Sequence, residues 1–378
     1  MLRLSVSQQY NDSNYFTFKS TGVRVYSFEE ALYHVYHFWR ESLDDFLCDE
    51  IITWVSELGL SFIASKMKEL TKEKHLQILD FLGLVDYFSA QELDTLKQTL
   101  QKWELRNEWE KLKERADFLV SRGEPIKALP LYKRALKYEE NAALLNNIAI
   151  ACMQLSAPKV AVSYLARAKT IEPDNQDILL HYVEAAILNH QYENAEAVLL
   201  TLPDSADVLF LRGLMAFEQK NYVKALSFYE KAAEANPKLP YYKYKAADVL
   251  GLRLRQFDKA LQTLQTIDVK DAPYYVKEAE IHSAAGDVPA SLKCMRKATE
   301  AGENSATLWA KLAEYYRKDY DWRRAEKAIT HAVTLAPDND LVRLERARIK
   351  KGLGRTRDYQ TELADLLKSF KTRYRGEV

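Results

Sequence analysis

Apolar side chains recur every three or four residues along much of the chain, which is the spacing that aligns them on one side of an α-helix. The pattern is clearest in residues 206–220 (ADVLFLRGLMAFEQK) and 306–320 (ATLWAKLAEYYRKDY). A second amphipathic segment follows each of them, at residues 221–237 and 321–337. Each of these ends at a proline, which cannot donate a hydrogen bond to the helix. The pattern therefore predicts helices that follow one another in pairs.

The second helix of each pair carries a common motif, in which a small residue, a large residue, an alanine and then a proline or glutamate stand at fixed intervals. The clear copies are Ala128/Tyr132/Ala135/Glu140, Ala161/Leu165/Ala168/Pro173, Ala225/Tyr229/Ala232/Pro237 and Ala325/Ile329/Ala332/Pro337. Weaker copies centre on Ala195, Ala260 and Ser291, and successive copies lie 33, 34, 30, 35, 31 and 34 residues apart. Because a small residue lets two crossing helices approach closely, the motif predicts a regular stack of helices.

These features resemble the tetratricopeptide repeat (TPR) family, whose pattern is W-x2-L-G-x2-Y, then A-x3-F, then A and P. The match is closest at 206–237 and 306–337, good at 109–140 and 142–173, and weaker near 176–203, 241–268 and 272–300. In the unit near 176–203 the second helix is expected to end early, at TLPDSAD. The resemblance implies an all-α fold, a TPR α-solenoid in which about seven helix pairs form a right-handed superhelix. A last pair, at 340–352 and 356–373, lacks the small residues and is expected to be a solvating cap.

The first 106 residues show no repeat, although their pattern is also helical. Ser27 with Glu30, and Ser89 with Glu92, have the spacing of capping boxes that open helices, and residues 14–26 alternate enough for a short extended segment. The expected parts are a helical N-terminal domain at 1–106, a TPR array at 107–338 and basic C-terminal capping helices at 339–378.

Composition and charge agree with a helical protein and add one candidate surface. Glycine and proline number only 11 and 10, which favours helices over sheets. The net charge is zero, but residues 341–378 hold 11 basic and 5 acidic residues, whereas residues 1–106 hold 11 basic and 16 acidic ones. A basic end could attract an acidic partner or nucleic acid, although a solvated helix is the simpler interpretation.

Cysteine usage and hydropathy indicate a cytoplasmic protein. The three cysteines lie far apart and include no CxxC pair, which fits a reducing compartment. No stretch approaches the roughly 20 apolar residues of a membrane span. We therefore expect a cytoplasmic chain with no membrane span.

The strongest candidate for chemistry lies in residues 28–46. If this segment is one helix, an apolar stripe faces the core and a polar stripe faces solvent, the latter made of Glu30, His34, His37, Glu41, Asp44 and Asp45. His34 and His37 could bind a divalent metal with the nearby glutamates, but no ligand from another element is indicated. A solvated face in which each histidine pairs with a glutamate is the favoured interpretation, with a mild pH response.

No other pattern indicates catalysis. The sequence has no GxxxxGK[ST] loop, no GxGxxG after a strand and no GxSxG elbow. Cys152 and Cys294 lie within repeat helices and are expected to be structural. The other histidines are interpreted as helix-face residues; they are His75, His181, His190, His282 and His331. The sequence thus predicts a protein that is not an enzyme and has no cofactor or metal.

The TPR resemblance implies a binding site for another protein. In that family, exposed positions on the first helix of each pair line the concave face. Here those positions are Asn146, Asn147, Ile150, Leu180, Glu184, Ile187, Phe210, Leu214, Phe217, Tyr242, Arg253 and Arg317. Five of them form an apolar stripe suited to a partner helix or extended segment, unless other helices or the N-terminal region cover it; they are Leu180, Ile187, Phe210, Leu214 and Phe217.

One TPR subclass binds the carboxylate tails of chaperones through a clamp of Lys, Asn, Asn, Lys and Arg. Lys113 and Asn147 match two of these positions, whereas Asp117, Asp177 and His181 occupy the other three. Two acidic residues would repel a carboxylate, so binding of a chaperone tail is not expected.

The leading hypothesis is a scaffold or adaptor that binds a helix or extended peptide in the concave TPR groove. The alternative is a bacterial TPR-type regulator or sensor that binds a signalling peptide or nucleic acid. Its support is the basic set Arg343, Arg346, Arg348, Lys350, Lys351, Arg355 and Arg357. Nucleic acid is the weaker candidate, because residues 1–106 are acidic and offer no basic recognition helix. A third class, metal-dependent chemistry, rests on His34 and His37 alone.

Overall fold

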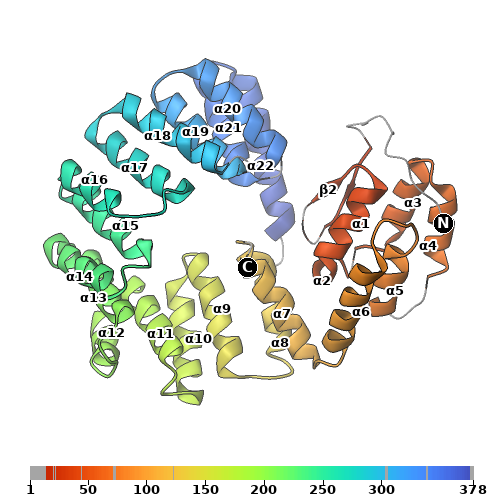
Figure 1. The fold of residues 1–378 in the computed structure, drawn as a ribbon, viewed down its shortest axis with the longest axis horizontal. Helices are drawn as coiled ribbons and strands as arrows, with labels where there is room; N and C mark the ends of the chain where they lie inside the picture. The colour runs from red at the N-terminus through yellow and green to blue at the C-terminus, as the bar shows by residue number, and fades with distance from the viewer. Residues whose placement is uncertain are drawn as a thin grey trace. The chain divides into compact units, whose positions relative to one another are not determined.

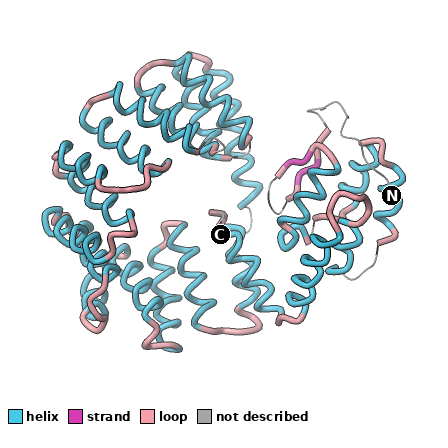
Figure 2. The backbone as a smooth tube through the Cα atoms, in the orientation of Figure 1, coloured by secondary structure: helices cyan, strands magenta, loops and turns pink. Residues whose placement is uncertain are grey.

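The computed structural model describes residues 14–374, except for residues 20, 22, 44, 71–73, 122, 303–304 and 338, and the side chains of 74–75 and 369–374. Helices make up most of the described chain (Figure 2). The strands found in this part are β1 (Phe16–Thr17) and β2 (Arg24–Val25), which pair antiparallel with Phe16 opposite Val25. The predicted all-α class is confirmed. None of the helices within the described ranges combines the length and apolar character needed to cross a bilayer.

The chain divides into two compact units, Met1–Asn147 and Ile148–Val378. The first helix pair of the repeat region therefore groups with the N-terminal helices. The three-part division at 106 and 338 stays a prediction.

The first unit begins with the β1–β2 hairpin and continues as short helices. These are α1 (Phe28–His37), α2 (Trp39–Ser42), α3 (Asp49–Glu57), α4 (Ser61–Lys68), α5 (Lys74–Leu82) and α6 (Ala90–Glu104) (Figure 1). Their core is aromatic: the ring of Phe81 makes edge-to-face contacts with Phe28 and Phe46, at centroid distances of 5.7 and 5.6 Å. Trp39 meets Trp103 of α6 in the same way at 5.2 Å. Such pairs add to the stabilisation from burial itself.

Local capping fixes where two of these helices begin. The Ser27 hydroxyl accepts a hydrogen bond from the backbone of Glu30 at 3.2 Å, and Ser89 forms a complete capping box with Glu92. Both starts agree with the sequence prediction. The predicted single helix over 28–46 is wrong, because the backbone leaves helical geometry at Phe38 and so separates α1 from α2.

The helix pair α7 (Glu108–Ser121) and α8 (Pro125–Ala135) also belongs to the first unit. Glu114 of α7 forms ion pairs with Arg40, at 2.7 Å, and with Arg106. The Phe118 ring lies 6.1 Å from that of Phe38. These contacts explain why the first pair clusters with the N-terminal helices.

The next helix, α9 (Ala142–Gln154), spans the boundary between the units. The second unit then consists of α10 (Pro158–Ile171), α11 (Gln176–Leu188), α12 (Tyr192–Leu199), α13 (Ala206–Glu218), α14 (Tyr222–Ala235), α15 (Pro240–Asp248), the π-helix η1 (Val249–Arg253), α16 (Phe257–Gln265), α17 (Ala272–Ala285), α18 (Val288–Ala301), α19 (Ala306–Lys318), α20 (Trp322–Leu335), α21 (Asp340–Gly352) and α22 (Thr356–Tyr374). From α11 onward each first helix packs on its second helix, and each pair packs on the next one (Figure 1). This is the predicted helical solenoid. The short α12 ends ahead of TLPDSAD, as the sequence predicts.

One backbone feature marks every pair. The turn between first and second helix contains a residue with positive φ, which only glycine adopts without strain. These residues are Gly123, Ser156, His190, Lys220, Arg255, Gly286, Tyr320 and Gly354. Their spacing reproduces that of the second-helix motif, and Gly354 follows Tyr320 at the same interval. The pair α21–α22 therefore shares the turn geometry of the repeats although it lacks their small residues.

Candidate functional site

The structure buries part of the predicted groove. Four of its side chains are buried, namely Ile187, Phe210, Leu214 and Tyr242. Seven are half-buried, namely Asn146, Asn147, Ile150, Leu180, Glu184, Phe217 and Arg317, and Arg253 is exposed. The expectation of an exposed apolar stripe is thus wrong for Ile187, Phe210 and Leu214, because neighbouring residues cover them. Phe210 shows the cause: its ring packs against Tyr229, Tyr241 and Tyr242 at centroid distances of 5.3 to 5.7 Å.

A carboxylate of the chain itself engages the two residues that match the carboxylate clamp. Lys113 donates to Oδ2 of Asp117 at 2.7 Å, and the Asn147 amide donates to Oδ1 at 2.7 Å. The Tyr132 hydroxyl also donates to Oδ1, at 2.6 Å. Burial, and then this bond to Asp117, raise the pKa of Tyr132. An internal carboxylate therefore lies where a partner's carboxylate would have to bind.

The first helices α13 and α15 and the π-helix η1 carry a surface of rings and cations. We call Phe217, Tyr241, Lys245 and Arg253 the aromatic–cationic surface. The Arg253 guanidinium carbon lies 5.2 Å from the centroid of the Phe217 ring, and Lys245 Nζ lies 5.3 Å from that of Tyr241. Within the described part of the chain neither cation forms an ion pair. Both charges therefore remain available to an anionic partner.

Glu184 of α11 is close enough to Lys245 to be affected by its charge. Burial raises the pKa of Glu184, and the positive charge of Lys245 opposes this only in part. The aromatic–cationic surface carries two positive charges, of which Glu184 can offset at most one, so the surface stays net positive.

A series of ion pairs links the first helices of the C-terminal helix pairs. Lys277 of α17 lies 2.8 Å from Asp248 of α15 and 2.7 Å from Glu280. Glu280 in turn accepts from Lys311 of α19 at 2.5 Å. Arg317 of α19 then reaches the buried Glu345 of α21, also at 2.5 Å. Charged side chains here bind one another, so this part of the first-helix face offers fewer unpaired charges than α13 and α15.

Five of the seven residues of the basic C-terminal set form ion pairs within the described part of the chain, although they share only three carboxylates. Glu362 of α22 lies 3.3 Å from Arg343, 2.5 Å from Arg346 and 3.1 Å from Lys350. Arg348 pairs with Glu345, Arg355 pairs with Glu326, and Lys351 lies over the Tyr359 ring. Burial alone would raise the pKa of Glu362, but hydrogen bonds from Arg346 and Lys350 outweigh it and lower the pKa.

The outward placement expected for the histidine pair is wrong for His34, whose side chain is only 3% exposed. Its ring stacks on Phe18 at 4.1 Å, and its Nε2 lies 3.1 Å from the Thr21 hydroxyl. The N-terminal extended segment thus covers the face that the helical pattern assigned to solvent. His37 is exposed as predicted.

Burial also extends to carboxylates beside the histidines. Glu41 and Asp45 are buried, and Asp44 lies outside the described residues. These side chains therefore do not form the solvated polar face that the sequence predicts.

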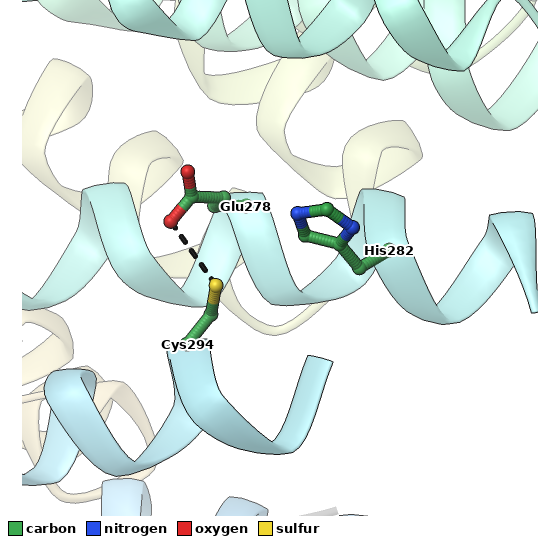
Figure 3. Close-up of side chains that lie close together, drawn as sticks. All are labelled: Glu278, His282 and Cys294. Carbon is green, nitrogen blue, oxygen red and sulfur yellow. Dashed lines mark hydrogen bonds between the residues drawn. The ribbon is translucent and has the colours of Figure 1, made fainter. Parts of the chain in front are cut away.

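A second cluster, which the sequence did not indicate, combines three kinds of metal-binding side chain. Glu278 and His282 lie one turn apart on α17, and Cys294 lies on α18 (Figure 3). Their ligand atoms all lie within 4.8 Å of one another. The interval of four between Glu278 and His282 is visible in the sequence, but only the packing of the two helices adds the cysteine.

A cavity of about 660 Å³ opens where α18, α19 and α20 meet. Its lining includes Arg296, Arg324, Lys327, Glu300, Trp309 and His331. Three cations and a single carboxylate make it electropositive, so it suits an anionic group. The sequence pattern did not indicate this cavity, because its residues come from three helices.

Residues 114–177 and 180–240 match the tetratricopeptide repeat family. The fold is similar to a tetratricopeptide repeat protein from Parabacteroides merdae ATCC 43184, with 20% identity, a TM-score of 0.45, and coverage of 65% of this chain and 99% of that one. A TPR protein from Thermus thermophilus has 19% identity, a TM-score of 0.36, and coverage of 55% and 98%. Yeast Tom70 has 14% identity, a TM-score of 0.35, and coverage of 70% and 69%. The family match falls on the helix pairs whose spacing identified the repeat.

Proposed function

We propose that this tetratricopeptide repeat protein is a non-enzymatic scaffold or adaptor that binds a helical or extended segment of a partner protein on the first helices of its repeats. Tetratricopeptide repeats form protein-interaction scaffolds, because stacked helix pairs present a long continuous surface. We place the binding site on the aromatic–cationic surface and its surroundings, and the protein in the cytoplasm. Cys48, Cys152 and Cys294 form no disulfide in the described structure, which fits a reducing compartment.

The observation that carries this proposal is the position of Lys245 and Arg253 against aromatic rings. A cation above a ring keeps its charge while the ring supplies apolar area, so each pair can bind a carboxylate and an apolar side chain side by side. The nearby Glu184 is half-buried and can offset at most one of these two positive charges. We therefore expect a partner segment with acidic side chains next to leucine or aromatic side chains.

The alternative, a regulator that binds nucleic acid, draws less support. Its basic residues are held by Glu345, Glu362 and Glu326. Phosphates would compete with these ion pairs for the cations, and the carboxylates of Glu345 and Glu362 are buried, so displacing the cations from them would cost free energy.

Selection of short random peptides on the purified full chain tests the proposal. Peptides that bind should be enriched in aspartate or glutamate together with leucine or an aromatic residue. Titration of a labelled synthetic copy should show about tenfold or greater weakening in Arg253→Glu and in Phe217→Ala, equivalent to about 1.4 kcal/mol or more.

The matched control is Lys224→Glu on the second helix α14. Lys224 is also an exposed cation near an aromatic ring, with Nζ 5.9 Å from the Phe228 centroid. It should leave peptide affinity within about twofold. Equal losses in Lys224→Glu and Arg253→Glu, or selected peptides without acidic residues, would contradict the proposed surface.

A further inference from the structure

We propose that Glu278, His282 and Cys294 form a binding site for a divalent transition-metal ion, with zinc as the best fit. Carboxylate, imidazole and thiolate are the three side-chain groups that zinc binds in proteins. In the structure their ligand atoms lie within 4.8 Å of one another (Figure 3). Tetrahedral zinc needs its ligand atoms about 3–4 Å apart, given metal–ligand bonds of about 2.0–2.3 Å. Small side-chain rotations are therefore enough to close the site.

The backbone holds these residues in a suitable arrangement. Glu278 and His282 stand four residues apart on α17, so both project from the same side of the helix. Cys294 comes from α18, which packs against α17 as the second helix of the same pair. A bound ion would join two helices, whereas no ligand from a second element was indicated for His34 and His37.

The surroundings of His282 favour one ring nitrogen for the metal. Its Nδ1 lies 3.9 Å from Oδ2 of Asp287, and Figure 3 shows the other ring nitrogen on the side of Glu278. A carboxylate on the outer nitrogen of a histidine orients the ring and increases its basicity toward a metal. Asp287 is itself held in place, because its Oδ1 caps α18 by accepting from the backbone of Ala290 at 3.0 Å.

The Cys294 thiol already contacts a second proposed ligand. Cys294 is only 6% exposed, and its Sγ donates to Oε2 of Glu278 at 3.1 Å. When the ion binds, the S–H bond breaks, a metal–sulfur bond forms and the proton leaves to solvent. Glu278 and His282 are half-buried, so the ion can enter from the solvent side.

Cobalt(II) is the probe, because cobalt bound to a thiolate shows a charge-transfer absorption in the near ultraviolet. Titration of Co²⁺ into the full chain, freed of metal by dialysis against a chelator, should saturate at one ion per chain. Zn²⁺ should then remove the absorption, and it should also raise the thermal unfolding midpoint of the wild-type chain.

Cys294→Ala and His282→Ala should each abolish the cobalt absorption and the thermal shift. Asp287→Asn should weaken cobalt binding by roughly 10–100-fold, as removal of such an outer partner does. Asparagine caps a helix as well as aspartate does, so this variant should keep its metal-free stability.

Cys48→Ala and His37→Ala are the matched controls, because they remove a half-buried cysteine and an exposed histidine elsewhere in the chain. Both should bind cobalt like the wild type. If Cys294→Ala unfolds, His282→Ala decides, since its side chain is half-buried. Absence of a saturable absorption in the wild type, or its persistence in His282→Ala, would overturn the proposal.

Discussion

The ring of Tyr229 fills the space where a β-carbon on Gly213 would lie, with its Cε1 2.6 Å from that position. The tyrosine ring of the second helix α14 fits against the first helix α13 because residue 213 has no side chain. Glycine in a helix normally weakens it by about 1 kcal/mol relative to alanine, so its presence needs such a reason.

Gly213→Ala should therefore destabilise the protein, although alanine is the better helix former. Overpacking in a well-packed contact costs about 1–3 kcal/mol. Urea unfolding followed by circular dichroism measures the effect, with Lys231→Ala on the exposed side of α14 as a control. An increase in stability would show that the two helices can separate without cost.

Removing a glycine from one turn should lower the stability of the protein, whereas adding a glycine to another turn should not lower it. Gly286 has φ +85°, and no atom lies near the place that an added β-carbon would take, so Gly286→Ala should cost about 1 kcal/mol through backbone strain alone. Lys220 is exposed and adopts φ +62°, so Lys220→Gly should leave stability unchanged or raise it by up to about 1 kcal/mol. Thermal unfolding of both variants checks the pair, and a loss in Lys220→Gly would contradict the strain argument.

Asp117 should matter for stability more than an ordinary surface aspartate. Asp117→Ala leaves Lys113, Tyr132 and Asn147 without their shared acceptor, which should cost about 1–3 kcal/mol. Asp174→Ala, at an exposed position, should stay within about 0.5 kcal/mol of the wild type. Urea titrations of the two variants compare these costs directly, and equal effects would argue against a stabilising network.

Acid should weaken the series of ion pairs that links α15, α17 and α19. Burial alone would raise the pKa of Glu280, but hydrogen bonds from Lys277 and Lys311 outweigh it and the pKa is lowered. A carboxylate whose pKa is lowered on folding stabilises the fold above its unfolded pKa, and this contribution disappears as the pH falls through the folded pKa.

Stability should therefore fall as the pH drops below the unfolded pKa of glutamate and through the lower folded pKa of Glu280, and Glu280→Gln should reduce that fall while costing about 1–3 kcal/mol at pH 7. Unfolding free energies measured across this range provide the test. Glu230→Gln on the exposed face of α14 is the control. An acid response in Glu280→Gln identical to that of the wild type would show that this carboxylate contributes nothing.

Local patterns in the sequence predicted what depends on helical periodicity. Ala225, Tyr229 and Ala232 are buried in α14 as the motif requires, and the early end of α12 follows from its proline-containing turn. The turn residues could not be identified in the same way, since Lys220, Arg255 and Tyr320 are not residue types that signal a positive φ.

Features that depend on contacts between distant segments could not be read from one helix at a time. His34 lies on the polar side of its helix by periodicity, yet Phe18 and Thr21 cover it. Phe210 was expected in the groove, but tyrosines of the next helices enclose it. The cluster of Glu278 with Cys294 likewise exists only because α17 and α18 pack together.

The recurring left-handed turn also bears on how such a chain can change its length over evolutionary time. Ser156 and His190 occupy equivalent places in successive turns, so removal of one full period between them would join two matching backbones. A duplication over the same interval would insert a helix pair whose ends already have the conformation that their neighbours require. Gains and losses of whole periods therefore conserve the backbone geometry at each junction, whereas a change of any other length must be absorbed by the helices or loops between two junctions. The interval between Lys220 and Arg255 contains the π-helix at Val249–Arg253, and the interval between His190 and Lys220 contains the short α12.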